Sequence, residues 1–175
     1  MTDEPLVHPT LTAVGLFVEA HAGLVQSLGR QLEQASGLSH QWFEVLLRLG
    51  RSPGGRLRMS DLAAQVTLSP SGLTRAVDRM EIAGLVAREA CPDDRRSMYA
   101  ALTPAGRTRI EQAVPGHLEH IQALLDDVYS PAEQAQFADL MRKLRDRINP
   151  CAVVGTTAEG ADVGDAGARA DAAVG

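Results

Sequence analysis

Side chains that can hydrogen-bond to base edges or to phosphates occur at helical spacing in residues 70–83. Four apolar residues at i, i+3, i+4 and i+7 predict the buried side of this helix: Leu73, Ala76, Val77 and Met80. The other side, with the residue that precedes the helix, carries polar and charged groups: Ser69, Ser71, Thr74, Arg75, Asp78 and Arg79. Arginine can bond a guanine through two donors, and serine or threonine can reach bases or phosphates. A helix that reads a DNA major groove has this composition, and so does a plain solvated helix.

A second group of charged residues lies in the stretch Cys91-Pro-Asp-Asp-Arg-Arg96. The segments on either side, 85–90 and 97–102, have strand-like composition, so the stretch is predicted to be the tip of a β-hairpin. A projecting Arg95 or Arg96 can enter a minor groove, and Asp94 can hold such an arginine by an ion pair. A polar turn with compensating charges is the alternative.

The elements that must position these two groups follow each other in a definite order. A short helix over 60–66, a tight turn at 66–69, the helix over 70–83 and the hairpin have the order of a winged helix-turn-helix. Three further signals mark helix starts, because a hydroxyl residue precedes a proline each time: Ser69-Pro70, Thr103-Pro104 and Ser130-Pro131. Glu133 completes a capping box at the third start.

Long amphipathic helices are predicted on both sides of this module. The first covers about 10–36 and ends at Gly37; the others run from 103 to about 129, with a kink or break at Pro115-Gly116, and on to 148. A further helix capped by Ser39 begins the module, which we place at about 39–102. Residues 1–9 are expected to form a loose arm and residues 149–175 a disordered tail, because that tail has eight alanines and five glycines but no leucine or aromatic residue. The fold class is mainly α with a small β-hairpin wing.

Charge is distributed unevenly along the chain, although the net charge at pH 7 is −5. Residues 48–109 contain eleven arginines and six acidic residues, so a basic face on an acidic body is predicted. No apolar run approaches the roughly 20 residues of a membrane span, and the N-terminus lacks a basic leader, so we expect a cytoplasmic protein without a membrane partner. No nucleophile–base pair, phosphate loop or complete metal set occurs, so neither an enzyme nor a cofactor is expected.

The stretch from Leu85 to Gly106 resembles the wing and the following helix start of the MarR family of bacterial transcription regulators. The matching features are Leu85-Val-Ala-Arg88, then Pro92-Asp-Asp-Arg-Arg96, then Leu102-Thr-Pro-Ala-Gly106. The segments around Leu62-Ala63 and from Ser69 to Glu81 are similar to the family's helix-turn-helix. The resemblance covers roughly Leu11 to Ile148.

This resemblance implies a homodimer in which the first helix and the last two helices interlock with those of a partner. Two winged modules would then meet successive turns of a pseudo-palindromic operator, with half-sites about 10 bp apart or a multiple of that, and the protein would act as a repressor. By position, the resemblance assigns double-stranded DNA contacts to Ser69, Ser71, Thr74, Arg75, Arg79, Asp94, Arg95 and Arg96.

Members of the MarR family often release DNA on binding a small phenolic or anionic effector, in a pocket between the dimer helices and the winged module. Reasonable lining residues here are Phe17, His21, Trp42, Phe43 and Leu46, for which a plain core role is the alternative. His117 and His120 form half of a metal site or are surface histidines, so a metal-sensing regulator stays an alternative. Cys91 is either a redox-sensitive thiol or a structural residue. A winged helix that binds protein rather than DNA is the rival class.

Overall fold

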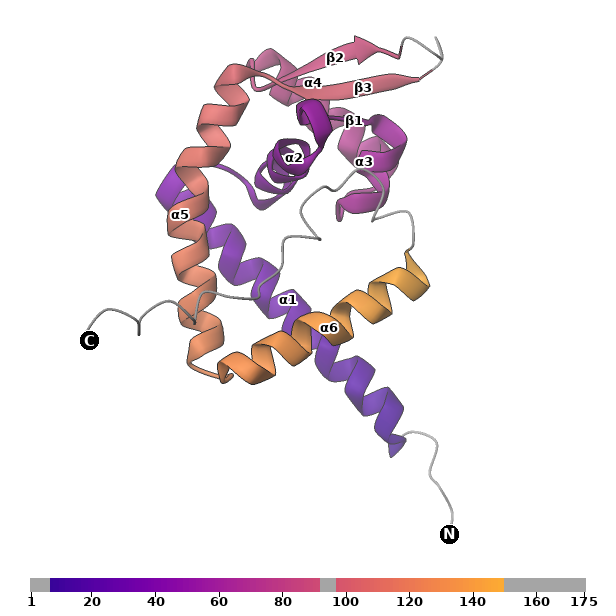
Figure 1. Cartoon of the computed structure of the whole chain (residues 1–175), viewed down its shortest axis with the longest axis vertical. Coiled ribbons are helices and arrows are strands. Elements are labelled where there is room, and N and C mark those ends of the chain that lie inside the picture. Colours follow the sequence, from indigo (N-terminus) through magenta and orange to yellow (C-terminus); the bar gives the residue numbers. More distant parts are fainter. Residues whose placement is uncertain (1–6, 92–96, 150–175) are drawn as a thin grey trace, which may run out of the picture.

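The computed structural model describes residues 7–91 and 97–149, and within them the chain is mainly helical with one small sheet (Figure 1). This confirms the predicted fold class. In chain order the elements are α1 (Pro9–Ser36), α2 (His40–Arg51), η2 (Pro53–Gly55), β1 (Arg56–Arg58), α3 (Met59–Gln65), α4 (Pro70–Ile82), β2 (Val86–Ala90), β3 (Met98–Leu102), α5 (Pro104–Asp126) and α6 (Pro131–Ile148).

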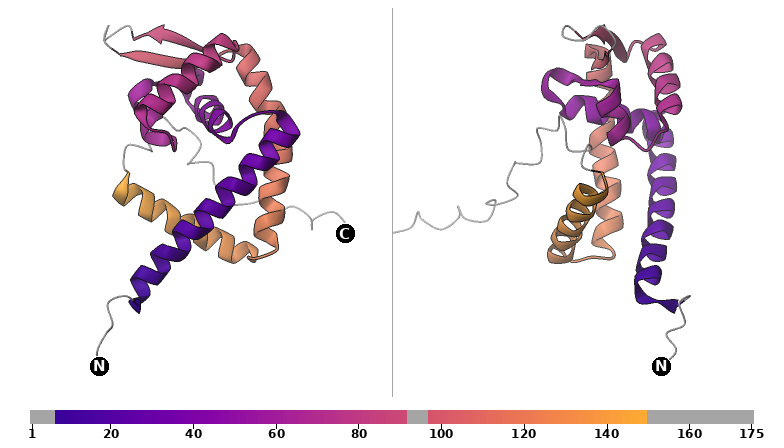
Figure 2. Two further views of the ribbon diagram at one scale, coloured as in Figure 1. Left: turned by 180° about the vertical axis from the view of Figure 1, so that it is seen from behind. Right: turned by 90° about the vertical axis from the view of Figure 1, so that its right-hand side faces the viewer.

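The winged module forms a compact body from α2, α3, α4 and the sheet, and α1 and α5 extend away from it (Figure 1). Its core is aliphatic, as the low aromatic content requires, and it draws side chains from every element of the module. Fully buried examples are Leu46, Leu49, Leu62, Leu73 and Met80. Helices α1 and α6 cross in Figure 1, but the side view of Figure 2 shows them apart.

Four helices begin where their hydroxyl caps predict. The side chains of Ser39, Ser69, Thr103 and Ser130 each accept a hydrogen bond from a backbone N–H in the first turn of their helix. The capping box at Ser130 is also present. At the other end of α1, Gly37 adopts a left-handed conformation with φ of 64° and ends the helix, as expected.

The sheet has a third strand that the sequence did not reveal. Its order is β1-β3-β2, and β1 pairs antiparallel with β3 so that Arg58 lies opposite Tyr99. Strand β1 has only three residues, and only the central Leu57 is buried. No periodicity can be detected in so short a segment, because its extended conformation depends on pairing with residues more than forty positions away.

Two predicted helix limits need correction. Helix α3 begins at Met59, one residue before the expected start. A kink or a break was expected at Pro115-Gly116, and a break is absent, since α5 is continuous through Pro115. A proline removes only one backbone donor from a helix, and Ile110, Ala113 and His117 keep α5 packed on both sides of that point.

The junction between the wing and α5 leaves no room for a side chain at Gly106. A Cβ atom there would stand 2.0 Å from the carbonyl oxygen of Leu85. Thr103 closes the same junction, because its hydroxyl donates to the carbonyl of Gly84 at 2.7 Å and accepts from Gly106 N–H at 3.0 Å. The Leu-Thr-x-x-Gly pattern therefore has a local physical cause.

Apolar side chains are exposed along α1 and α6. Leu16 in α1 is 61% exposed, Ile148 in α6 is 72% exposed, and no residue of α6 is buried. By length and composition alone, α1 is apolar enough to cross a membrane, contrary to the expectation that no apolar run approaches such a span. The predicted arm up to residue 6, the wing tip at 92–96 and the tail from residue 150 lie outside the described residues, whereas Asn149 is the C-cap of α6.

Candidate nucleic-acid interface

Helix α4 presents the predicted polar side to solvent. Leu73, Ala76, Val77 and Met80 are buried, which confirms the predicted inner side. Ser69, Ser71, Thr74, Arg75 and Arg79 are all exposed, and Asp78 is half-buried. The structure thus brings together every predicted contact residue that it describes on one side of α4 and at its N-terminus. Their contact with DNA stays a prediction.

The turn before α4 is fixed to α2 by a carboxylate. Thr67 donates its backbone N–H at 3.2 Å and its hydroxyl at 2.8 Å to Glu44. Because the three hydrogen bonds engage both carboxylate oxygens, Glu44 fixes the position of this turn and so the angle between α3 and α4. Sequence reasoning missed Glu44, because its partner lies 23 residues away.

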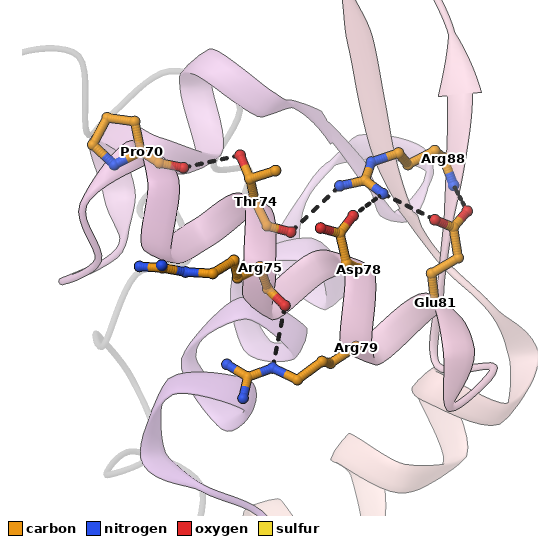
Figure 3. Close-up of polar contacts among 7 residues, drawn as sticks. All are labelled: Pro70, Thr74, Arg75, Asp78, Arg79, Glu81 and Arg88. Carbon is orange, nitrogen blue, oxygen red and sulfur yellow. Dashed lines mark hydrogen bonds and ion pairs between the residues drawn. The ribbon is translucent and has the colours of Figure 1, made fainter.

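Arg88 of β2 connects the wing to α4 (Figure 3). Its guanidinium contacts Asp78 at 2.5 Å and Glu81 at 3.0 Å, and it donates to the Thr74 carbonyl at 3.4 Å. The backbone N–H of Arg88 also donates to Glu81 at 3.1 Å. The hydrogen bond with Asp78 is the largest cause that raises the pKa of Arg88 above its ordinary value. We call Arg88, Asp78 and Glu81 the wing clasp.

Arg75 and Arg79 extend away from the wing clasp in Figure 3. Arg79 Nε donates to the Arg75 carbonyl at 3.2 Å, which leaves its terminal nitrogens directed outward. Thr74 Oγ1 donates to the Pro70 carbonyl at 3.0 Å, so its proton is used within the helix. The two arginines are therefore the donors best placed for an external acceptor on α4.

The base of the wing is described, but its tip is not. Cys91 N–H donates to the Ser97 carbonyl at 3.1 Å, which closes the hairpin below the tip. Asp94, Arg95 and Arg96 lie outside the described residues, so the predicted ion pair and minor-groove contact stay predictions. The Cys91 side chain is buried, in agreement with a structural residue.

The predicted effector-pocket residues occupy two separate regions of the described chain. Phe17 and His21 lie on the exposed part of α1, with ring centroids 6.4 Å apart. Phe43 and Leu46 are buried in α2, and Trp42 is partly buried beside them. Phe43 packs against His117 with ring centroids 4.4 Å apart. One chain alone does not bring the five residues together.

His117 is buried rather than on the surface, which corrects one of the two interpretations of this residue. Its ring hydrogen-bonds to Gln31 at 2.9 Å, while His120 contacts Ser27 at 3.2 Å. Burial lowers the pKa of His117, and the nearby His40 and His120 lower it further. Within the described residues, no group of three or more metal-ligating side chains occurs.

Comparisons with known proteins agree with this geometry. Residues 36–97 match the family model described as MarR family. The transcriptional repressor YetL of Bacillus subtilis is 30% identical over 113 residues, which is 65% of this chain and 67% of YetL. Two Streptomyces coelicolor structures have a TM-score of 0.71: Sco3205 in complex with DNA (33% identity, 80% of this chain, 88% of that chain) and AbsC (30%, 82%, 97%).

Another similar structure is that of a protein whose DNA binding is regulated by a small molecule. BpsR of Bordetella bronchiseptica has a TM-score of 0.65 and 26% identity, over 76% of this chain and 93% of that chain, and its DNA binding is regulated by 6-hydroxynicotinic acid. The family model covers most of the winged module, and the structural matches extend beyond it, since they cover 76% to 82% of this chain. The chain belongs to the MarR family of transcriptional regulators.

Proposed function

We propose that two copies of this chain pair through α1, α5 and α6 and repress transcription from a pseudo-palindromic operator. The observation that carries the proposal is the combination of one exposed arginine pair on α4 with apolar side chains of α1 and α6 that no described residue covers. A pair of modules is needed, because a single module contacts only one half-site.

The apolar side chains of the long helices make the dimer interface in this proposal. Exposed apolar residues occur along α1 and α6, with one in α5: Leu11, Val14, Leu16, Phe17, Val18, Leu24, Leu118, Phe137, Leu140, Leu144 and Ile148. So many exposed apolar side chains on the long helices mark an interaction site. Dimerisation therefore accounts for α1 better than a membrane span does, because Glu19, His21 and Arg30 interrupt its sequence.

In the complex, α4 enters the major groove and the wing enters the adjacent minor groove. Arg75 and Arg79 bond to base edges, and Ser69, Ser71 and Thr74 contact bases or phosphates. Arg95 or Arg96 reaches the minor groove, with Asp94 orienting it. The protein acts without catalysis and in the cytoplasm, where bacterial DNA lies.

A small aromatic acid or phenol releases the operator. BpsR supports this part of the proposal, since its regulator is a hydroxylated aromatic acid. In the proposed dimer, Phe17 and His21 of α1 line one side of the effector pocket. Trp42, Phe43 and Leu46 of α2 line the other side. The effector must bind more tightly to the arrangement of the two modules that cannot bind the operator than to the arrangement that can. Otherwise it does not shift the equilibrium between the two arrangements.

Selection of bound sequences from a random DNA pool, followed by gel-shift titration, tests the proposal. We expect a palindromic site, a steep loss of affinity with salt, and a dimer by analytical ultracentrifugation. Replacing Arg95 and Arg96 together by alanine should weaken binding strongly. The control replaces Arg56, which pairs with Glu89 at 3.2 Å and is assigned neither a DNA contact nor a place in the dimer interface.

Three results would contradict the proposal or a part of it. Absence of any salt-dependent DNA affinity favours the winged-helix module that binds protein. A monomer that still protects a full palindrome would refute pairing through the long helices. Retained affinity in the Arg95/Arg96 variant would remove the wing from the interface while leaving α4 in place.

A further inference from the structure

A cleft of about 330 Å³ lies where the wing, α3 and α4 meet. Its polar lining residues come from five elements or their ends: Arg58, Ser60, Thr74, Arg88 and Ser97. None of the residues assigned to DNA from the sequence lies in this cleft except Thr74. Its two cationic side chains, Arg58 and Arg88, differ in whether acidic residues of the protein compensate their charge.

The charge of Arg88 is compensated inside the protein, whereas that of Arg58 is not. Arg88 pairs with both carboxylates of the wing clasp. Within the described residues, Arg58 forms no ion pair, and Asp61 has the weakest of the effects that act on its guanidinium. Arg58 therefore supplies the uncompensated positive charge of the cleft.

Tyr99 holds the Arg58 side chain in place. The two residues face each other across β1 and β3, and the guanidinium carbon lies 5.9 Å from the centroid of the tyrosine ring. A hydrogen bond with Tyr99 is the largest cause that raises the pKa of Arg58. A cation fixed in this way loses less conformational freedom on binding than a free side chain.

The position of the cleft identifies its ligand. The major and minor grooves of a duplex are separated by a sugar–phosphate backbone, and the cleft lies between the helix assigned to one groove and the wing assigned to the other. We propose that the cleft binds a DNA phosphodiester, with Arg58 as the residue that contacts the phosphate. This inference rests on the proposed function, because it needs α4 and the wing in adjacent grooves.

Arg56 is a control within the same strand. It lies two residues from Arg58, on the same side of the sheet, and its guanidinium carbon is 5.2 Å from the Tyr99 ring. Arg56 is paired with Glu89 at 3.2 Å and does not line the cleft. Arg56→Ala and Arg58→Ala change the net charge equally, so only a specific contact distinguishes them.

The first test measures operator affinity against salt for the wild type and both variants. We expect Arg58→Ala to bind about tenfold more weakly, and the slope of log affinity against log salt to fall by about 0.9 per lost phosphate contact. The loss should be equal on operator and unrelated DNA, because a phosphate carries no sequence information. Arg56→Ala should keep the wild-type slope, and Arg58→Lys should restore most of it. Circular dichroism and thermal melting confirm that each variant is folded.

The second test locates the phosphate. Operators with one neutral methylphosphonate at a time are titrated with wild type and Arg58→Ala. We expect one position in each half-site, between the contacts of α4 and of the wing, to weaken the wild type but not Arg58→Ala. Equal salt slopes for Arg58→Ala and Arg56→Ala, or the same sensitive positions in both proteins, would overturn the phosphate site alone. Failure of the wild type to bind any DNA would instead overturn the proposed function.

Discussion

Arg88 of the wing strand and Asp78 of α4 approach to 2.5 Å. This contact joins the two parts of the molecule that we propose to enter different grooves, and Glu81 supports it from the next turn of α4 at 3.0 Å. The wing can therefore not move relative to α4 without breaking a charged hydrogen bond. The angle between the two parts is set within one protomer, before any DNA is bound.

Removing the arginine of the wing clasp should affect binding more than stability. For Arg88→Ala we expect a loss of about 1 kcal/mol in the free energy of unfolding, because Asp78 is 49% exposed and water screens the pair. Operator affinity should fall further, since Asp78 and Glu81 then face DNA as uncompensated charges. A double-mutant cycle with Asp78→Ala, by urea unfolding and gel shift, measures the coupling. Strictly additive effects would show that the pair does not couple wing and helix.

Arg75→Ala should reduce specificity as well as affinity. Its guanidinium is exposed on α4, and loss of a bidentate contact with guanine costs about 1–3 kcal/mol. Titration against operators with single base changes should show that one base position no longer matters to the variant. Arg56→Ala, at a residue assigned neither a DNA contact nor a place in the dimer interface, serves as the charge-matched control. A uniform loss over all sequences would assign Arg75 to the backbone instead.

Gly106→Ala should destabilise the fold severely, by roughly 3 kcal/mol or more, because the new methyl group meets backbone that cannot yield. Gly116→Ala in the same helix is the control, since nothing lies within 4 Å of its Cβ position. There, alanine should stabilise by about 0.5–1 kcal/mol through its better helix propensity. Thermal and urea unfolding measure both. If Gly106→Ala is as stable as the wild type, α5 can move away from the wing without a loss in the free energy of unfolding.

Stability should fall when the solution is acidified, in part because of His117. Its pKa in the folded chain lies below the ordinary 6.5, through burial and through the neighbouring His40 and His120. As the pH falls through 6.5, the unfolded chain binds a proton that the folded chain excludes, so the free energy of unfolding decreases until the folded pKa is reached. Urea unfolding between pH 7.5 and pH 5 measures this loss.

The variant His117→Gln should weaken that pH dependence. Glutamine keeps a polar group beside Gln31 without a titrating proton, and His21→Gln on the exposed part of α1 is the control. An unchanged slope of stability against pH in His117→Gln would exclude His117 as its source.

Much of the fold could be predicted because its signals are local. The hydroxyl caps at Ser39, Ser69, Thr103 and Ser130 and the terminating Gly37 act on their own turns of helix, so they can be recognised in sequence. Strand β1 could not, since it exists by pairing with β3. Continuity through Pro115 is likewise a tertiary effect of packing on both sides of the proline.

The features of the candidate site that depend on local sequence could likewise be predicted, and those that depend on tertiary packing could not. The inner and outer sides of α4 follow from helical spacing, and every buried position was predicted. Arg88 and Asp78 were both visible, in the Leu-Val-x-Arg pattern and on the polar side of α4, but their contact depends on how β2 packs against that helix. Arg58 gave no signal, because its significance comes from β1 and Tyr99.

Because α5 is unbroken, it links the wing at its N-terminal end rigidly to the helices at its C-terminal end. Its 23 residues span about 35 Å at 1.5 Å per residue, and its first turn is fixed to the wing at Gly106 and Thr103. A tilt of about 5° at the far end therefore displaces the near end by about 3 Å, close to the rise of one base pair. In the dimer that we propose, an effector that tilts the paired helices by this angle would move both copies of α4 out of position on the operator at once.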